Sequence, residues 1–275
     1  MEKINFMPWQ YALDQANMIM IHCSFGSDSC KKSYFELVKQ AGFDGVILWW
    51  GNDYGDADYR DNPSLARSVG LIVENVHLPF ADINNLWLDN LDGDTLFSNS
   101  MRWVDDCVNF DIPTFIFHLS SGDNPPPFNN LGLNRVKSIV EKAEKHDIHI
   151  AFENLRKVEY LEYVLSQVDS PYAGFCYDSG HHAHRSPHVD LLMKYGSRLK
   201  ALHLHDNDGT EDQHLLPFDG IVDWSKTMCD IAKTGYMGAV TLEVGIERYK
   251  ELQQNDFLQL AFERGKKLRT LKLQV

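Results

Sequence analysis

The sequence predicts an α/β protein that folds as a single (β/α)8 (TIM) barrel, one domain spanning residues 1–275. Short apolar runs occur eight times, and several are almost continuously apolar, as parallel strands buried on both faces are. Helical patterns lie between these runs, and the length of 275 residues is close to the roughly 250 typical of such barrels. An open doubly wound sheet is the structural alternative. The chain lacks both a Gly-x-Gly-x-x-Gly turn after a strand and a Walker A motif, so nothing supports a nucleotide-binding open sheet.

The expected elements alternate along the whole chain. The strands are expected at 18–25, 45–50, 72–78, 114–120, 148–154, 173–178, 199–205 and 239–244. The helices are expected at 33–42, about 94–110, 134–147, 158–168, 223–235 and about 255–271. The helix at 223–235 begins with Asp223, a side chain that caps free backbone N–H groups, and ends at Gly235.

Composition restricts the class of protein. The chain has 26 Lys and Arg against 39 Asp and Glu, a net charge of −13, so it has no overall basic surface for nucleic acid. Its five cysteines are odd in number and include no C-x-x-C pair, which argues against a disulfide framework. The N-terminal residues do not form a signal peptide, and no apolar run approaches the roughly 20 residues that cross a bilayer. We therefore expect a cytoplasmic protein without a membrane partner.

Imidazoles and carboxylates stand at the ends of six successive expected strands, the third to the eighth. They are His77, His118, Glu153, Asp178, His181, His203, His205, Asp212, His214 and Glu243. In a (β/α)8 barrel the carboxyl ends of all strands meet at one mouth, so we expect these side chains to converge. Carboxylates buried there without partners are costly, and a divalent cation offsets that cost. We predict a site for one to three divalent ions (Zn, Mn, Fe or Co), because its ligands are nitrogen and oxygen with no thiolate.

Two arrangements of these ligands stay open at this point. One is a single site with open positions for substrate oxygens, built from Glu153, Asp178, His203 and Glu243. The other adds a second and a third site, built from His77, His118, His181, Asp212 and His214. His205 competes with His203, because residues two apart on a strand face the same side.

At these residues the sequence resembles the xylose isomerase-like TIM barrel superfamily. That superfamily includes sugar-phosphate isomerases and epimerases, ketose 3-epimerases and the endonuclease IV group (AP endonuclease family 2). The run HLHDND at 203–208, followed by Asp212 and His214, carries most of the resemblance, and Asp178-x-x-His181 carries the next part. The epimerase pattern implies Glu153, Asp178, His203 and Glu243 as ligands of one metal. The endonuclease pattern of nine ligands to three zinc ions finds an acceptable residue at all nine positions. The family pattern His-x-x-Asp favours His203 over His205 as the strand ligand.

We predict a metal-dependent isomerase or epimerase of a sugar or sugar phosphate, working by proton transfer through a metal-stabilised enediolate. The resemblance implies that Glu153 and Glu243 are the catalytic acid and base. Their presence argues against a binding protein that has lost catalysis. We expect substrate contacts from four further residues, with Arg185 reaching distal hydroxyls or a phosphate and the tryptophans forming an aromatic wall. These residues are His205, Arg185, Trp49 and Trp50.

The alternative function is an endonuclease IV-like hydrolase of phosphodiesters that uses several zinc ions. A DNA enzyme needs Lys or Arg near its mouth for phosphate contacts. The loop at 51–62 is instead acidic with a single Arg, and the segment at 81–94 has acidic residues and no basic ones. These loops favour a small-molecule substrate over duplex DNA. The resemblance is also compatible with a homodimer.

Overall fold

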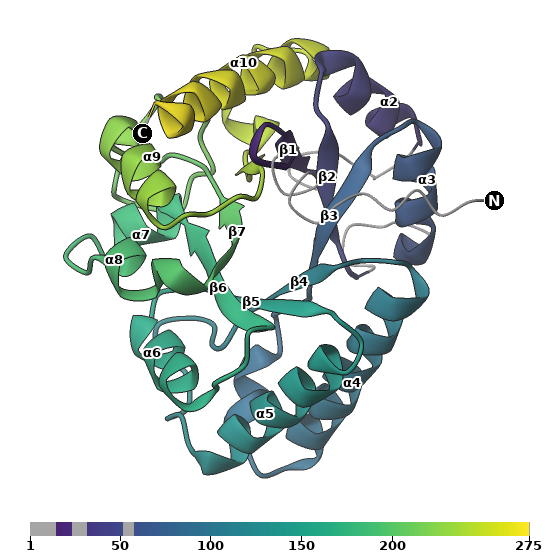
Figure 1. Ribbon diagram of the computed structural model, residues 1–275, viewed down its shortest axis with the longest axis vertical. Coiled ribbons are helices and arrows are strands. Elements are labelled where there is room, and N and C mark those ends of the chain that lie inside the picture. The colour runs from purple at the N-terminus through teal and green to yellow at the C-terminus, as the bar shows by residue number, and fades with distance from the viewer. Residues whose placement is uncertain (1–14, 24–31, 52–57, 275) are drawn as a thin grey trace.

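The structure is a computed structural model, and it describes residues 15–23, 32–51 and 58–274. In this part of the chain, parallel strands surround a central axis and helices form a ring outside them (Figure 1). The strands are β1 (Ile19–His22), β2 (Gly45–Trp49), β3 (Ile72–His77), β4 (Thr114–Phe117), β5 (His149–Glu153), β6 (Ala173–Asp178), β7 (Leu199–His203) and β8 (Val240–Leu242). The α-helices are α2 (Lys32–Ala41), α3 (Asn62–Ser68), α4 (Leu91–Asn109), α5 (Asn130–Glu144), α6 (Val158–Gln167), α7 (Ser179–Arg185), α8 (Leu191–Tyr195), α9 (Trp224–Lys233) and α10 (Gln254–Leu273).

The sheet closes on itself. Its hydrogen-bonded order is β7-β6-β5-β4-β3-β2-β1-β8, and all the pairs are parallel. The two ends meet at a bridge between Leu204 and Leu242, where the Leu204 N–H donates to Thr241 O at 2.9 Å and the Glu243 N–H donates to Leu204 O at 3.2 Å. The predicted (β/α)8 barrel is therefore confirmed. Among the described helices, none is long and apolar enough to span a membrane.

Capping residues set where the helices begin. The predicted strands and helices are all present, but α4 and α5 begin three or four residues earlier than expected. The side chains of Asn90 and Asn129 accept hydrogen bonds from the N–H groups of Gly93 and Gly132, at 2.8 and 3.0 Å, and so start these helices. Asp223 caps α9 in the same way, as predicted. The short helices α3, α7 and α8 were not anticipated, because they are too short to show a periodic pattern.

The core has two layers, and the inner layer positions the site. Most buried apolar residues pack between the strands and the surrounding helices. A second, smaller cluster lies inside the barrel and consists of Ile116, Ala151, Cys176 and Ala201. The residues two positions later are His118, Glu153, Asp178 and His203. Since side chains alternate along a strand, each of these polar residues points into the barrel, one layer nearer its mouth.

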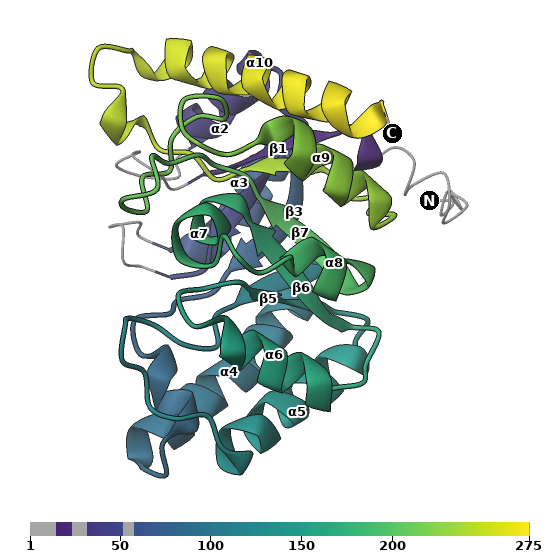
Figure 2. The same ribbon diagram turned by 90° about the vertical axis from the view of Figure 1, so that its left-hand side faces the viewer.

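A partly buried carboxyl group lies at the opposite end of the barrel. Glu74 in β3 accepts a hydrogen bond from the Thr241 hydroxyl of β8 at 2.7 Å. With the first residues of several strands, Glu74 lines a cavity of about 430 Å³ at that end. In Figure 2 this end of the barrel lies on the side where the C-terminus is marked, and α7 lies on the other side. Burial raises the pKa of Glu74 to about 7, although the Thr241 hydrogen bond opposes the shift.

Glu74→Gln is expected to stabilise the protein above neutral pH. The folded protein binds the Glu74 proton more tightly than the unfolded chain, whose carboxyl has a pKa of 4.5. This contribution to stability is present below pH 4.5 and is lost as the pH rises through about 7. In urea unfolding at pH 8, the free energy of unfolding of the variant should therefore exceed that of the unaltered protein by about 1–2 kcal/mol. This difference should disappear at pH 4.5. Parallel pH profiles for the two proteins would contradict this assignment, and the exposed Glu159→Gln is the matched control.

Candidate metal centre

A cavity of about 250 Å³ opens at the carboxyl ends of the strands. Its wall contains most of the predicted ligands: His77, His118, Glu153, His181, Asp212, His214 and Glu243. Asp178 and His203 lie against these residues and have no exposed surface. The structure thus brings together all nine residues of the predicted ligand set, drawn from β3 through the segment after β8.

Glu153 is the central carboxylate, and four imidazoles contact it. Its Oε2 atom lies 3.2 Å from His118 Nε2, 3.3 Å from His77 Nε2 and 3.3 Å from His203 Nδ1. Its Oε1 atom lies 3.0 Å from His181 Nδ1. Burial alone would raise the pKa of Glu153, but the charges of His118 and His203 outweigh it and hold this pKa well below its ordinary value. The site therefore stabilises an ionised carboxylate at 2% exposure.

Glu243 is the second buried carboxylate, and it shares an imidazole with Glu153. Its Oε2 atom lies 3.0 Å from His203 Nδ1, so His203 stands between the two carboxylates. Burial would raise the pKa of Glu243, but the charge of His203 lowers it well below its ordinary value. Conversely, burial would lower the pKa of His203, while Cys176, Glu243 and Glu153 together raise it well above its ordinary value.

Asp178 is held in place at the junction of β6 and α7. Its backbone N–H donates to the Asn154 side chain at 2.8 Å, and its Oδ1 atom accepts from the His181 N–H at 2.7 Å, which caps α7. His205 Nε2 lies 3.0 Å from Asp178 Oδ1. Gly180 allows this close approach, because a Cβ atom there would stand 1.9 Å from the His205 ring.

Asp212 organises a second group of imidazoles after β7. Its Oδ2 atom lies 3.1 Å from His181 Nε2 and 3.5 Å from His214 Nε2. The rings of His205 and His214 stack with centroids 4.1 Å apart. Burial would raise the pKa of Asp212, but its hydrogen bonds to His181 and His214 hold it far below its ordinary value. Burial would also lower the pKa of His214, yet the hydrogen bond that its ring donates to Asp212 raises it to about 9.

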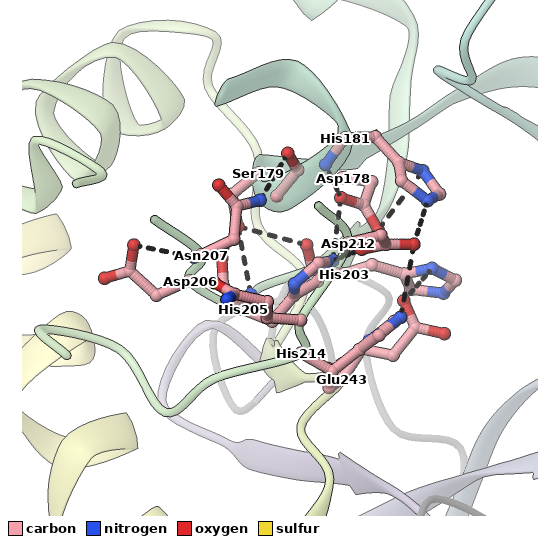
Figure 3. A network of polar contacts seen from close by, with 12 residues as sticks. Asp178, Ser179, His181, His203, His205, Asp206, Asn207, Asp212, His214 and Glu243 are labelled. Carbon is pink, nitrogen blue, oxygen red and sulfur yellow. Dashed lines mark hydrogen bonds and ion pairs between the residues drawn. The ribbon is translucent and has the colours of Figure 1, made fainter. Parts of the chain in front are cut away.

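The donor set fits a divalent cation. Three groups of ligand atoms lie within 4.8 Å of one another: Glu153, Asp178, His203 and Glu243; His77, Glu153 and His203; and His205, Asp212 and His214. Figure 3 shows Asp178, His181, His203, Asp212, His214 and Glu243 gathered in one region, whereas the carboxylate of Asp206 points away from them. Several buried atoms here make no hydrogen bond of acceptable geometry, namely both ring nitrogens of His203, Nδ1 of His205, Oδ1 of Asp212 and Oε2 of Glu243. Buried polar atoms rarely stay unsatisfied, and a metal ion satisfies atoms of these types.

A substrate contact from His205 stays a prediction. The structure places His205 with Asp212 and His214 in a candidate ligand group. The reason is strand alternation, which continues past His203 and turns His205 to the same side. His205 is fully buried, and its Nε2 atom contacts Asp178.

Asp206 fixes the loop that carries the second group. Its carboxylate accepts hydrogen bonds from the backbone N–H groups of Asn207, Phe218 and Val222, at 3.0 to 3.1 Å. It also accepts one from the Trp224 indole at 2.8 Å. The acidic residue of the His-x-x-Asp pattern therefore holds the loop between β7 and α9, and it is fully buried there.

The two predicted tryptophans point in opposite directions. Trp49 is half-buried and stacks on His77 with ring centroids 5.3 Å apart, beside the cavity. Trp50 is fully buried outside the barrel, where its indole N–H donates to Asp106 at 3.0 Å and its ring packs against Tyr59. The expectation that Trp50 contacts substrate is therefore corrected: adjacent strand residues alternate, so only one of the pair faces the mouth.

The remaining predicted contact, Arg185, lies at the rim. Its guanidinium is 4.0 Å from Asp123 and is not among the residues that line the cavity. Sequence reasoning missed Arg156 and Phe80, which do line it, and Phe80 stacks on His118 at 4.3 Å. It also missed His22, which ends β1 with 2% exposure and lies 6.2 Å from the His77 ring. The signal available in the sequence was position: Arg156 comes just after β5, Phe80 comes just after β3, and His22 ends β1.

Comparisons with known proteins agree with this architecture. Residues 35–262 match the family model described as "Xylose isomerase-like TIM barrel". The uncharacterized protein y4fM of Sinorhizobium fredii is 28% identical over 268 residues, which cover 82% of this chain and 84% of the relative. Fructoselysine 3-epimerase of Escherichia coli is 36% identical over 58 residues, 21% of each chain.

A solved structure shares the fold over nearly its whole length. D-psicose 3-epimerase from Clostridium cellulolyticum H10, crystallised with D-tagatose, superposes with a TM-score of 0.76 at 16% identity. The superposition covers 92% of this chain and 99% of that one. At this identity the likeness concerns the fold. The family match over residues 35–262 shows that the chain belongs to the family of xylose isomerase-like TIM barrels.

Proposed function

We propose that the protein is a metal-dependent isomerase or epimerase of a sugar or sugar phosphate. The observation that carries the proposal is the convergence of Glu153, Asp178, His203 and Glu243, all buried and with ligand atoms within 4.8 Å of one another. Glu153 and Glu243 also border a cavity of about 250 Å³, a size that suits a small molecule. The epimerases among its relatives and fold neighbours support the same class of substrate.

These four residues would hold the cation. A bound divalent cation would offer open positions to two adjacent substrate oxygens and offset the negative charge that develops on them. The residues around it set its environment: Asn154 orients Asp178, and the four imidazoles around Glu153 keep that carboxylate in a fixed position. The cavity beside them is also lined by Phe80, and the Trp49 ring stacks on His77, so aromatic surface borders the site.

The proton would move between the substrate and the two glutamates. One carboxylate takes the proton from the carbon beside the carbonyl, so a C–H bond breaks, an O–H bond forms and an enediolate remains on the substrate. Both carboxylates are held ionised in the structure, so the other glutamate must bind a proton when substrate is present. It then gives this proton to the opposite face of that carbon and produces the epimer. Glu153 ends β5 and Glu243 follows β8, so the two approach the cavity from different strands of the barrel.

Proton exchange in deuterated water tests this function directly. The protein loaded with Mn²⁺ or Co²⁺ is incubated with free ketoses and with ketose phosphates, and the products are followed by NMR. We expect deuterium to enter at the carbon next to the carbonyl while the epimer or isomer accumulates. Metal-loaded protein that incorporates no deuterium into any ketose would refute the proposal.

The second candidate function is phosphodiester hydrolysis by several metal ions. The observation in its favour is the separate ligand group of His205, Asp212 and His214 beside the central one. The described surface opposes a nucleic acid partner, since Asp82, Asp89 and Asp92 are exposed in the segment at 81–94. In the other acidic loop, residues 52–57 lie outside the described residues. Zinc-loaded protein that hydrolyses bis(p-nitrophenyl) phosphate but exchanges no ketose proton would favour this candidate.

A further inference from the structure

The wall of the cavity combines two kinds of residue. One kind is the carboxylates and imidazoles of the candidate metal centre. The other consists of Ser120, Ser121 and Gly122 after β4 and of Leu155 and Arg156 after β5. Among the described residues that line the cavity, Arg156 is the one with a permanent positive charge. A neutral sugar needs no such charge, so its presence in the same cavity as the candidate metal ligands indicates what the far end of the substrate carries.

The Arg156 guanidinium has more N–H donors than its contact with Asp123 uses. Its NH1 group contacts Asp123 Oδ1 at 3.2 Å, and its side chain is 42% exposed. Arg185 NH1 lies 4.0 Å from the same Asp123 oxygen. Two guanidinium groups therefore share one carboxylate, which leaves a net positive charge at the rim. A guanidinium offers five N–H donors in a planar fork that matches the oxygens of a phosphate or carboxylate.

The surrounding loops hold this side of the cavity in place. The Asn84 side chain donates to Ser121 O and accepts from the Ser121 N–H, both at 2.9 Å. Farther along the same loop, Phe128 stacks on Tyr163 of α6 with ring centroids 4.4 Å apart. These contacts tie the loop after β4 to the elements around it, so the charged rim has a defined position relative to the metal centre.

Only a short stretch of chain separates Arg156 from Glu153. Arg156 follows Glu153 by three residues, so their Cα atoms lie at most about 11 Å apart. Both side chains reach into the same cavity. A five- or six-carbon sugar whose carbonyl end lies at the metal centre can place its other end beside Arg156.

We propose that Arg156, assisted by Arg185, binds an anionic group at the end of the substrate remote from the reacting carbons. The substrate class is then a sugar phosphate or a sugar acid rather than a neutral sugar. This inference rests on the proposed isomerase or epimerase function, because it assigns the far end of that same substrate. Without substrate, both guanidinium groups lie near Asp123. When substrate binds, its anionic group replaces Asp123 as their partner.

Binding of compounds that do not react tests the inference apart from catalysis. The Mn²⁺-loaded protein is titrated calorimetrically with ribitol, ribitol 5-phosphate and ribonate. We expect the phosphate or the carboxylate to bind at least about tenfold more tightly than ribitol, as charge-assisted hydrogen bonds imply. The tighter of the two anions identifies the class. Arg156→Gln should abolish this preference and leave ribitol binding unchanged, whereas the neighbouring Lys157→Gln should keep the preference.

Two results separate this inference from the proposed function. Equal affinity for ribitol and both anions, unchanged in Arg156→Gln, would overturn the anion site even if the protein exchanges ketose protons. An anion preference that depends on Arg156 supports the anion site, whatever the deuterium-exchange experiment shows about catalysis. An anion preference that persists in Arg156→Gln would also overturn the assignment, because the anion would then bind elsewhere.

Discussion

Replacing Glu153 or Glu243 with Gln is expected to reduce the interconversion of ketose epimers by about 10²–10⁴-fold, the usual contribution of general acid–base catalysis. Gln has the shape of Glu but cannot exchange a proton with carbon. Both positions are buried, at 2% and 3% exposure, so water cannot readily take over the role. Since both residues are also candidate ligands, the rates are measured at saturating Mn²⁺ with the bound metal quantified.

Glu159→Gln is the matched control for these variants. It makes the same chemical change six residues after Glu153, at an exposed position in the first turn of α6. Its rate should equal that of the unaltered protein. If Glu153→Gln and Glu243→Gln both interconvert epimers at the control rate while metal is bound, neither residue is the acid or the base.

Asp206→Ala is expected to lower the free energy of unfolding by about 3–5 kcal/mol. The change leaves three backbone N–H groups and the Trp224 indole N–H without their shared acceptor, and buried donors without partners are costly. Urea unfolding of metal-free protein measures the loss. Because Asp206 holds the loop that carries Asp212 and His214, the affinity for added metal should also fall, by about tenfold or more.

Asp208→Ala provides the comparison within the same loop. Asp208 is exposed, and its carboxylate accepts from Thr210 and Gln213 at the surface. Its replacement should cost less than about 1 kcal/mol. Equal losses for the two variants would show that Asp206 does not have the structural role assigned to it.

The barrel and the ligand cluster could be predicted because both follow from short-range rules. Continuous apolar runs mark buried parallel strands, and the closure of the barrel brings their carboxyl ends to one mouth. The position of each ligand follows from strand alternation. Ala151 lies inside the barrel, so Glu153 also points inward, and Ala201 and His203 stand in the same relation.

The same alternation, applied strictly, would have corrected the expectation for Trp50. Trp49 faces the mouth and Trp50 faces the helices, and His205 follows His203 to the inside. Arg156 could not be found in this way, because it lies on a loop whose path depends on distant contacts. Helix starts at Asn90 and Asn129 were missed because a capping Asn is hard to tell from an ordinary loop residue until its hydrogen bond is seen.

The residues of this site come from both strands and loops, so the loop residues can be exchanged by protein engineering while the strands stay unchanged. Glu153, Asp178 and His203 belong to the strands themselves, whereas Ser120 and Arg156 belong to the loops that follow β4 and β5. Chimeras that exchange residues 119–129 or 155–157 with those of another family member are thus expected to alter which compounds are accepted, while Asn154 and the candidate cation ligands stay in register. Such chimeras would test whether the loops after β4 and β5 set the choice of substrate while Glu153, Asp178 and His203 keep their places in the strands.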